Sequence, residues 1–189
     1  MQKKSALYRL IVIAVLLALG MVLPFLTGQI PTIGQAISPL HIPAFIAGLT
    51  CGWGWGMALG FILPLLRSVI FGMPPLVAVG IPMAFELCAY GVLTGLLYPW
   101  LRGKLCKLGV SRLVVILATL GIAMVAGRIV GGAAKALLIT AGLIPGIPLT
   151  FAMFVTSYFV ETSLGALVHL IVVPAVVLAL EKAHLSPNA

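Results

Sequence analysis

The chain is 189 residues long, 62% of its residues are hydrophobic and only 7% are charged, and its mean hydropathy is +1.28. A soluble domain is about 25% charged, so this composition excludes an ordinary cytosolic globule, a disordered tail and a nucleic-acid-binding domain. The net charge of +8 is instead interpreted through membrane topology, in which Lys and Arg mark cytoplasmic loops. The sequence therefore predicts an all-α integral membrane protein.

Six membrane-spanning helices are predicted, because one span needs roughly 20 apolar residues. Basic residues cluster at the N-terminus and in the loop 102–112, so both are expected in the cytoplasm, and an even number of spans must separate them. The N- and C-termini are then both cytoplasmic. The helices form a single transmembrane domain, 1–189, and cover approximately residues 6–26, 42–53, 56–70, 82–101, 112–141 and 149–180.

The stretch 42–70 is the weak point of this topology, since it must cross the membrane twice or not at all. A break at Gly52 to Gly56 gives two helices, but the first would span only about 18 Å. A competing interpretation is a continuous stripe of small residues, because glycines recur every four residues and would let helices pack closely. We expect helix packing rather than chemistry from these glycines, which are Gly48, Gly52, Gly56 and Gly60, with Gly91/Gly95 and Gly127/Gly131 in later helices.

Five ionisable residues lie inside the predicted spans, and each is a functional-site hypothesis because charge is costly in hydrocarbon. Most fall in the outer half of the membrane under the predicted topology. Spacing also groups them with neighbours on shared helix faces. The predicted substrate-binding residues are Arg67, Glu86 with Tyr90, Arg128 with Lys135 across Gly131, and Tyr158 with Glu161.

The charges within the spans are three bases and two acids, an excess that favours a substrate with a carboxylate or phosphate. The alternative is internal neutralisation, in which Glu86 and Glu161 each pair with a basic residue and only hold helices together. Two acids cannot neutralise all three bases, so this alternative accounts for single residues better than for the whole set.

Signals of an enzyme, a metal site or a cofactor are missing from the sequence, so none of these is expected. The chain has no HExxH, no GxSxG, no Asp and no GxxxxGK[ST] phosphate-binding loop. The histidines His41, His169 and His184 lack metal-ligand spacing, and His169 is interpreted as a core or interface histidine. Cys51, Cys88 and Cys106 are interpreted as small buried residues.

Several segments together resemble the S components of energy-coupling factor (ECF) transporters, small membrane proteins that capture vitamins in prokaryotes. They are the six-helix layout, 72-GMPPL-76 ahead of 82-PMAFELCAYG-91, the basic loop after the fourth helix, and 14-AVLLA-18 in the first helix. The resemblance covers nearly the whole chain and implies a multi-pass protein of the prokaryotic cell membrane.

The resemblance implies a division of labour between this chain and its partners. The chain would bind one vitamin in a cavity open to the outside, formed by 27–41, 71–81 and the outer parts of the last three helices. A transmembrane coupling subunit, docked on Ala14 and Ala18, and two ABC ATPases would then drive release into the cytoplasm. The cationic excess favours a carboxylated vitamin such as pantothenate, while folate, another acid or a cobalamin-type ligand stays open.

Two other function classes are weighed against transport. A helical membrane scaffold without a ligand would tolerate simultaneous replacement of Arg67, Arg128 and Lys135. An intramembrane enzyme is disfavoured because the chain has no nucleophile motif and no Asp.

Overall fold

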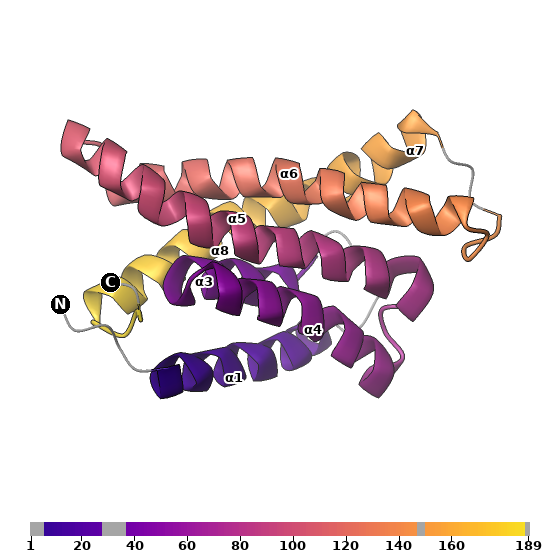
Figure 1. Cartoon of the computed structure of the whole chain (residues 1–189), viewed down its shortest axis with the longest axis horizontal. Coiled ribbons are helices and arrows are strands. Elements are labelled where there is room, and N and C mark those ends of the chain that lie inside the picture. Colours follow the sequence, from indigo (N-terminus) through magenta and orange to yellow (C-terminus); the bar gives the residue numbers. More distant parts are fainter. Residues whose placement is uncertain (1–5, 28–36, 147–149, 188–189) are drawn as a thin grey trace.

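All regular elements of the described chain are helices. The computed structural model describes residues 6–27, 37–146 and 150–187, and no strand occurs within these ranges. The predicted all-α class is confirmed for this part of the chain. The main helices are α1 (Ala6–Val22), α3 (His41–Cys51), α4 (Trp53–Phe71), α5 (Ile81–Leu105), α6 (Arg112–Thr140), α7 (Phe151–Val155) and α8 (Ser163–Lys182) (Figure 1). Shorter helical segments are η1 (Leu23–Thr27), η2 (Leu76–Gly80), η3 (Cys106–Leu108) and η4 (Thr156–Val160).

Five helical stretches in the described chain are long and apolar enough to cross a membrane. They are Ala6–Phe25, Trp53–Phe71, Leu76–Leu108, Arg112–Thr140 and Phe151–Lys182. The sixth predicted span is represented by α3, which has only 11 residues. Because α3 is buried along all its residues except Ile42, it lies within the bundle rather than against lipid. The six-span topology therefore stays a prediction.

A single residue separates α3 from α4. Gly52 has φ of 99°, a conformation that favours glycine, and the next helix begins at Trp53. The predicted break is therefore confined to Gly52, while Gly54 and Gly56 lie inside α4. Gly48 in α3 and Gly56 in α4 nevertheless lie in contact. The helix break at Gly52 and close packing through the spaced glycines are therefore both present.

The glycines bring the backbones of α3, α4 and α5 into direct contact. A Cβ placed on Gly56 would lie 2.7 Å from the Cα of Gly48 and 2.9 Å from that of Gly91. A Cβ on Gly95 would lie 2.2 Å from the backbone nitrogen of Trp53. These approaches leave no room for any side chain, so these glycines do serve packing, as expected.

Three predicted boundaries need correction. Residues 76–80, predicted as part of a loop, are π-helical and run directly into α5. Arg102 and Lys104, predicted in a loop, lie in the last turns of α5. The last span is not one helix, because α7 and η4 are separated from α8 by a turn at Glu161 and Thr162.

The start of α1 and the end of α8 lie at the same end of the bundle, as Figure 1 shows. There the Tyr8 hydroxyl donates to the Leu185 carbonyl at 2.7 Å. The turn between α5 and α6 shares this end, since Arg102 and Arg112 lie 3.5 and 3.4 Å from the buried carboxylate of Glu181. Because the start of α1, the α5–α6 turn and the end of α8 lie at one end of the bundle, an even number of helical passes separates each from the next.

Candidate functional site

A cavity of about 230 Å³ opens at the end of the bundle opposite the two helix ends just described. Its walls come from segments spread over the whole chain, from η1 to α8. Residues of the predicted outer loops contribute Ser38 to His41 and Met73 to Pro75, while 28–36 lie outside the described residues. The polar side chains that line it are Ser38, His41, Arg67, Glu86, Arg128, Lys135, Ser157, Tyr158, Glu161, Thr162 and His169.

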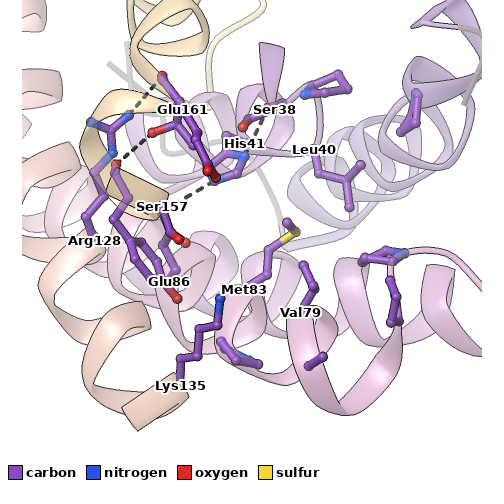
Figure 2. Close-up of a pocket in the computed structure, with 18 of the residues that line it drawn as sticks. Ser38, Leu40, His41, Val79, Met83, Glu86, Arg128, Lys135, Ser157 and Glu161 are labelled. Carbon is purple, nitrogen blue, oxygen red and sulfur yellow. Dashed lines mark hydrogen bonds and ion pairs between the residues drawn. The ribbon is translucent and has the colours of Figure 1, made fainter. Parts of the chain in front are cut away.

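Two of the cations come from one face of α6. Arg128 is 9% exposed, donates from Nη2 to the Thr162 carbonyl at 3.3 Å, and lies 5.4 Å from the centre of the Phe159 ring. Lys135 is partly buried and points into the cavity in Figure 2. In residues 6–27, 37–146 and 150–187, no carboxylate lies within the 4.0 Å ion-pair distance of either cation.

Arg67 is the third cation, and it is bound to the end of the first helix. Its side chain is almost completely buried and donates from Nη1 to the Met21 carbonyl. The guanidinium carbon lies 5.0 Å from the ring centres of both Phe25 and Phe71, within cation–π distance. Arg67 therefore joins α4 to α1 and η1 while it also lines the cavity.

Glu86 belongs to a buried hydrogen-bonded cluster. Its Oε1 accepts from the Tyr90 hydroxyl at 2.6 Å and lies 3.5 Å from Nε2 of His41. The Ser38 carbonyl lies 3.0 Å from Nδ1 of His41 and 3.1 Å from Nε2 of His169. The two imidazole rings are stacked with centres 5.4 Å apart. The main partners of Glu86 are thus Tyr90 and His41, rather than the Lys or Arg that internal neutralisation required.

The conformation of Ser38 fixes the position of this carbonyl. Ser38 has φ of 48°, in the left-handed region that non-glycine residues rarely adopt. In this conformation its carbonyl also accepts from the backbone N–H of His41 at 3.1 Å. One carbonyl therefore orients both histidines at the start of α3 and within α8.

The turn between η4 and α8 supplies the last two predicted residues. Tyr158 lies in η4 and Glu161 in the turn, and both line the cavity. Glu161 is exposed, and within the described ranges no basic side chain lies within ion-pair distance of it. Figure 2 shows Glu161 beside Arg128 on the wall of the cavity.

The structure thus gathers six of the seven predicted binding residues around one cavity: Arg67, Glu86, Arg128, Lys135, Tyr158 and Glu161. Tyr90 does not line it, because its ring is 1% exposed and packs on Phe45 at 4.5 Å while its hydroxyl supports Glu86. Sequence reasoning placed the segment 27–41 at the cavity through the family resemblance but singled out neither Ser38 nor His41. It interpreted His169 as a core or interface histidine. His169 is indeed 2% exposed, but it also reaches the cavity wall.

The predicted docking residues lie on a different surface. Ala14 and Ala18 are exposed on α1, together with apolar neighbours such as Ile11, Val15 and Val22. Within residues 6–27, 37–146 and 150–187, no other helix covers these side chains.

Comparison with known proteins identifies the family. The family model for the substrate-specific component of ECF transporters matches residues 8–177. No curated protein and no solved structure matches the chain. The chain therefore belongs to the substrate-specific components of ECF transporters and is a multi-pass protein of the prokaryotic plasma membrane. The family is a transporter component that associates with an ECF module, and it is not an enzyme family.

Proposed function

We propose that this chain captures a small anionic vitamin from outside the cell in the cavity between its helices, and passes it to an ATP-driven coupling module. A carboxylated vitamin such as pantothenate fits best. The observation that carries this proposal is the pair of cations on α6, Arg128 and Lys135, which line the cavity without a carboxylate at ion-pair distance within the described chain.

Electrostatics favours an anionic ligand at these two side chains. A charged group away from water is costly unless it is paired, and intramembrane charges mark ligand sites for that reason. A carboxylate bound between Arg128 and Lys135 would supply the missing counter-charge and form charge-assisted hydrogen bonds. Occupancy should therefore stabilise the cavity itself.

The size of the cavity also restricts the ligand. Its volume of about 230 Å³ lies below the range of roughly 300–1,000 Å³ that is usual for drug-sized ligands. This supports a compact vitamin over folate or a cobalamin-type ligand.

The exposed face of α1 supports docking on a transmembrane coupling subunit that works with two ABC ATPases. Ala14 and Ala18 are small, so another helix could approach closely there without breaking any hydrogen bond on release. Such a surface suits a partner that must bind and dissociate during transport.

Identification of the bound molecule tests the capture step. The chain is purified without partners, and mass spectrometry identifies what co-purifies. We expect a small anion, retained by the wild type and lost from the R128M/K135M variant. R112Q, which removes a cation at the opposite end, is the matched control and should retain it. A ligand-free wild type that also fails to associate with ECF coupling subunits would contradict the proposal.

Substitution of the small residues tests docking. A14L or A18L should abolish uptake by cells that express the coupling module, while vitamin binding by the purified variant persists. Ala175 and Ala179 offer a matched control, because they have the same spacing and are also exposed, but on α8. A175L and A179L should transport normally. Normal uptake by A14L and A18L would remove α1 as the docking face.

A further inference from the structure

The pair formed by Glu86 and His41 has a feature that a purely cationic site would not need. Both side chains are more than nine-tenths buried, yet both line the cavity. His41 approaches Glu86 from α3 through Nε2, at 3.5 Å from Oε1, and Tyr90 donates to the same oxygen from one turn further along α5. The cavity thus contains a carboxylate held in a defined orientation.

Hydrogen bonding to the Ser38 carbonyl fixes the orientation of the His41 ring. A carbonyl only accepts, so Nδ1 of His41 carries the hydrogen that contacts the Ser38 carbonyl. Nε2 is thereby directed toward Glu86 and lies 3.5 Å from its Oε1. The imidazole and the Tyr90 hydroxyl together hold this end of the carboxylate in place.

The second oxygen of Glu86 is available to a ligand. Oε1 takes both contacts, and no hydrogen bond to Oε2 occurs within the described residues. No fully buried side-chain nitrogen or oxygen in that part of the chain lacks a partner, so Oε2 must open to the cavity. The glycine opposite leaves space there, because a Cβ on Gly131 would lie only 3.0 Å from Oε2.

We infer that Glu86 Oε2 accepts a hydrogen bond from an O–H or N–H group of the ligand, whose anionic group is bound by Arg128 and Lys135. The inference rests on the proposed function and narrows its substrate class to a compact carboxylate that also bears a hydroxyl, amide or ureido donor. An anion without such a donor would leave Oε2 buried and unpaired, which weakens binding. His41 and Tyr90 are positioning residues that orient Glu86.

Four monocarboxylates serve as probes: pantothenate and biotin carry O–H or N–H donors, whereas lipoate and nicotinate carry none. Binding to the purified wild-type chain is measured by isothermal titration calorimetry. We expect pantothenate or biotin to bind at least tenfold more tightly than lipoate and nicotinate. Panthenol, which has an alcohol in place of the carboxylate of pantothenate, should bind at least tenfold more weakly than pantothenate. Equal or tighter binding of the donor-free acids, or no binding of any acid, would overturn the inferred class.

Two carboxylate variants separate donor recognition from simple electrostatics. Removal of a negative charge from a cationic cavity should strengthen binding of an anion. E161Q should accordingly raise the affinity for the tighter-binding donor-bearing acid. E86Q should instead lower it at least tenfold, because its amide N–H₂ can occupy the position of Oε2 and would oppose the donor of the ligand. An unchanged melting temperature of unliganded E86Q shows that the variant is folded.

The outcomes also separate this inference from the proposed function. Anion binding that E86Q strengthens or leaves unchanged would overturn the role of Glu86 but leave the proposed function in place. A wild-type chain that retains no small molecule and does not associate with a coupling subunit would contradict the proposed function itself.

Discussion

Gly131 determines how much room the cavity has beside Glu86. A Cβ at this position would lie 2.8 Å from Cβ of Glu86 and 3.2 Å from Cε1 of Tyr158. The Cβ of Glu86 moves only with the backbone of α5, whereas the Tyr158 ring can turn, so G131A should shift α5 locally against α6 and displace the Glu86 carboxylate. We expect the affinity for the co-purifying ligand to fall about tenfold, equivalent to about 1.4 kcal/mol, in a titration of the purified protein.

Gly121 is the matched control for this prediction, because it lies in the same helix and a Cβ there would meet nothing within 4 Å. G121A should bind normally and should be as stable as the wild type or slightly more so, since alanine favours a helix. Equal affinities of G131A and G121A would contradict a role for Gly131 in shaping the cavity.

The residues that sequence reasoning found are those whose chemistry is conspicuous in an apolar chain. Arg128, Lys135 and Glu161 stand out because each is a rare charge within a predicted span. His41 gave no such signal, because it lies at the end of a predicted loop and its partner Glu86 is 45 positions away along the chain. Only the packing of α3 against α5 brings the two together, and sequence spacing does not report contacts between helices.

At the scale of elements, the α4–α5 contact depends on backbone atoms rather than side chains. A Cβ on Gly91 would lie 2.2 Å from the carbonyl carbon and oxygen of Gly56. Backbone cannot rotate away as a side chain can, so G91A should force the helices apart. We expect a cost of about 1–3 kcal/mol or more, seen as a lower melting temperature and a loss of the monodisperse peak in detergent.

Gly54 supplies the comparison within α4, since a Cβ there would contact nothing within 4 Å. G54A should keep the melting temperature of the wild type. If G91A and G54A behaved alike, the close approach of α4 and α5 would not be a determinant of stability.

Glycine marked one helix boundary in the sequence, and other boundaries had no such marker. Gly52 allowed the break between α3 and α4 to be expected, because its φ of 99° is one that glycine adopts readily. The break after η4 has no such marker, since it falls at Glu161 and Thr162. Proline was no guide either: Pro64, Pro99 and Pro174 all lie inside continuous helices.

At the scale of the whole molecule, basic residues separate into two groups. Arg67, Arg128 and Lys135 line the cavity. The other described Lys and Arg residues lie at the opposite end of the bundle, and they are Arg9, Arg102, Lys104, Lys107, Arg112 and Lys182. The described Lys and Arg residues are thus divided between the cavity and the opposite end of the bundle. By the positive-inside rule, this second group should face the cytoplasm, which directs the cavity outward.

Cysteine labelling tests this orientation. Leu143 is 59% exposed in the turn after α6, and Leu108 is 78% exposed in the turn before it. In a background with Cys88 and Cys106 replaced by alanine, a membrane-impermeant maleimide should label L143C in intact cells. It should label L108C only after permeabilisation. The parent without either new cysteine sets the baseline, because the remaining Cys51 is fully buried. The reverse pattern would place the cavity on the cytoplasmic side, which is incompatible with capture from outside. Labelling of both cysteines in intact cells would mean that α6 does not cross the membrane.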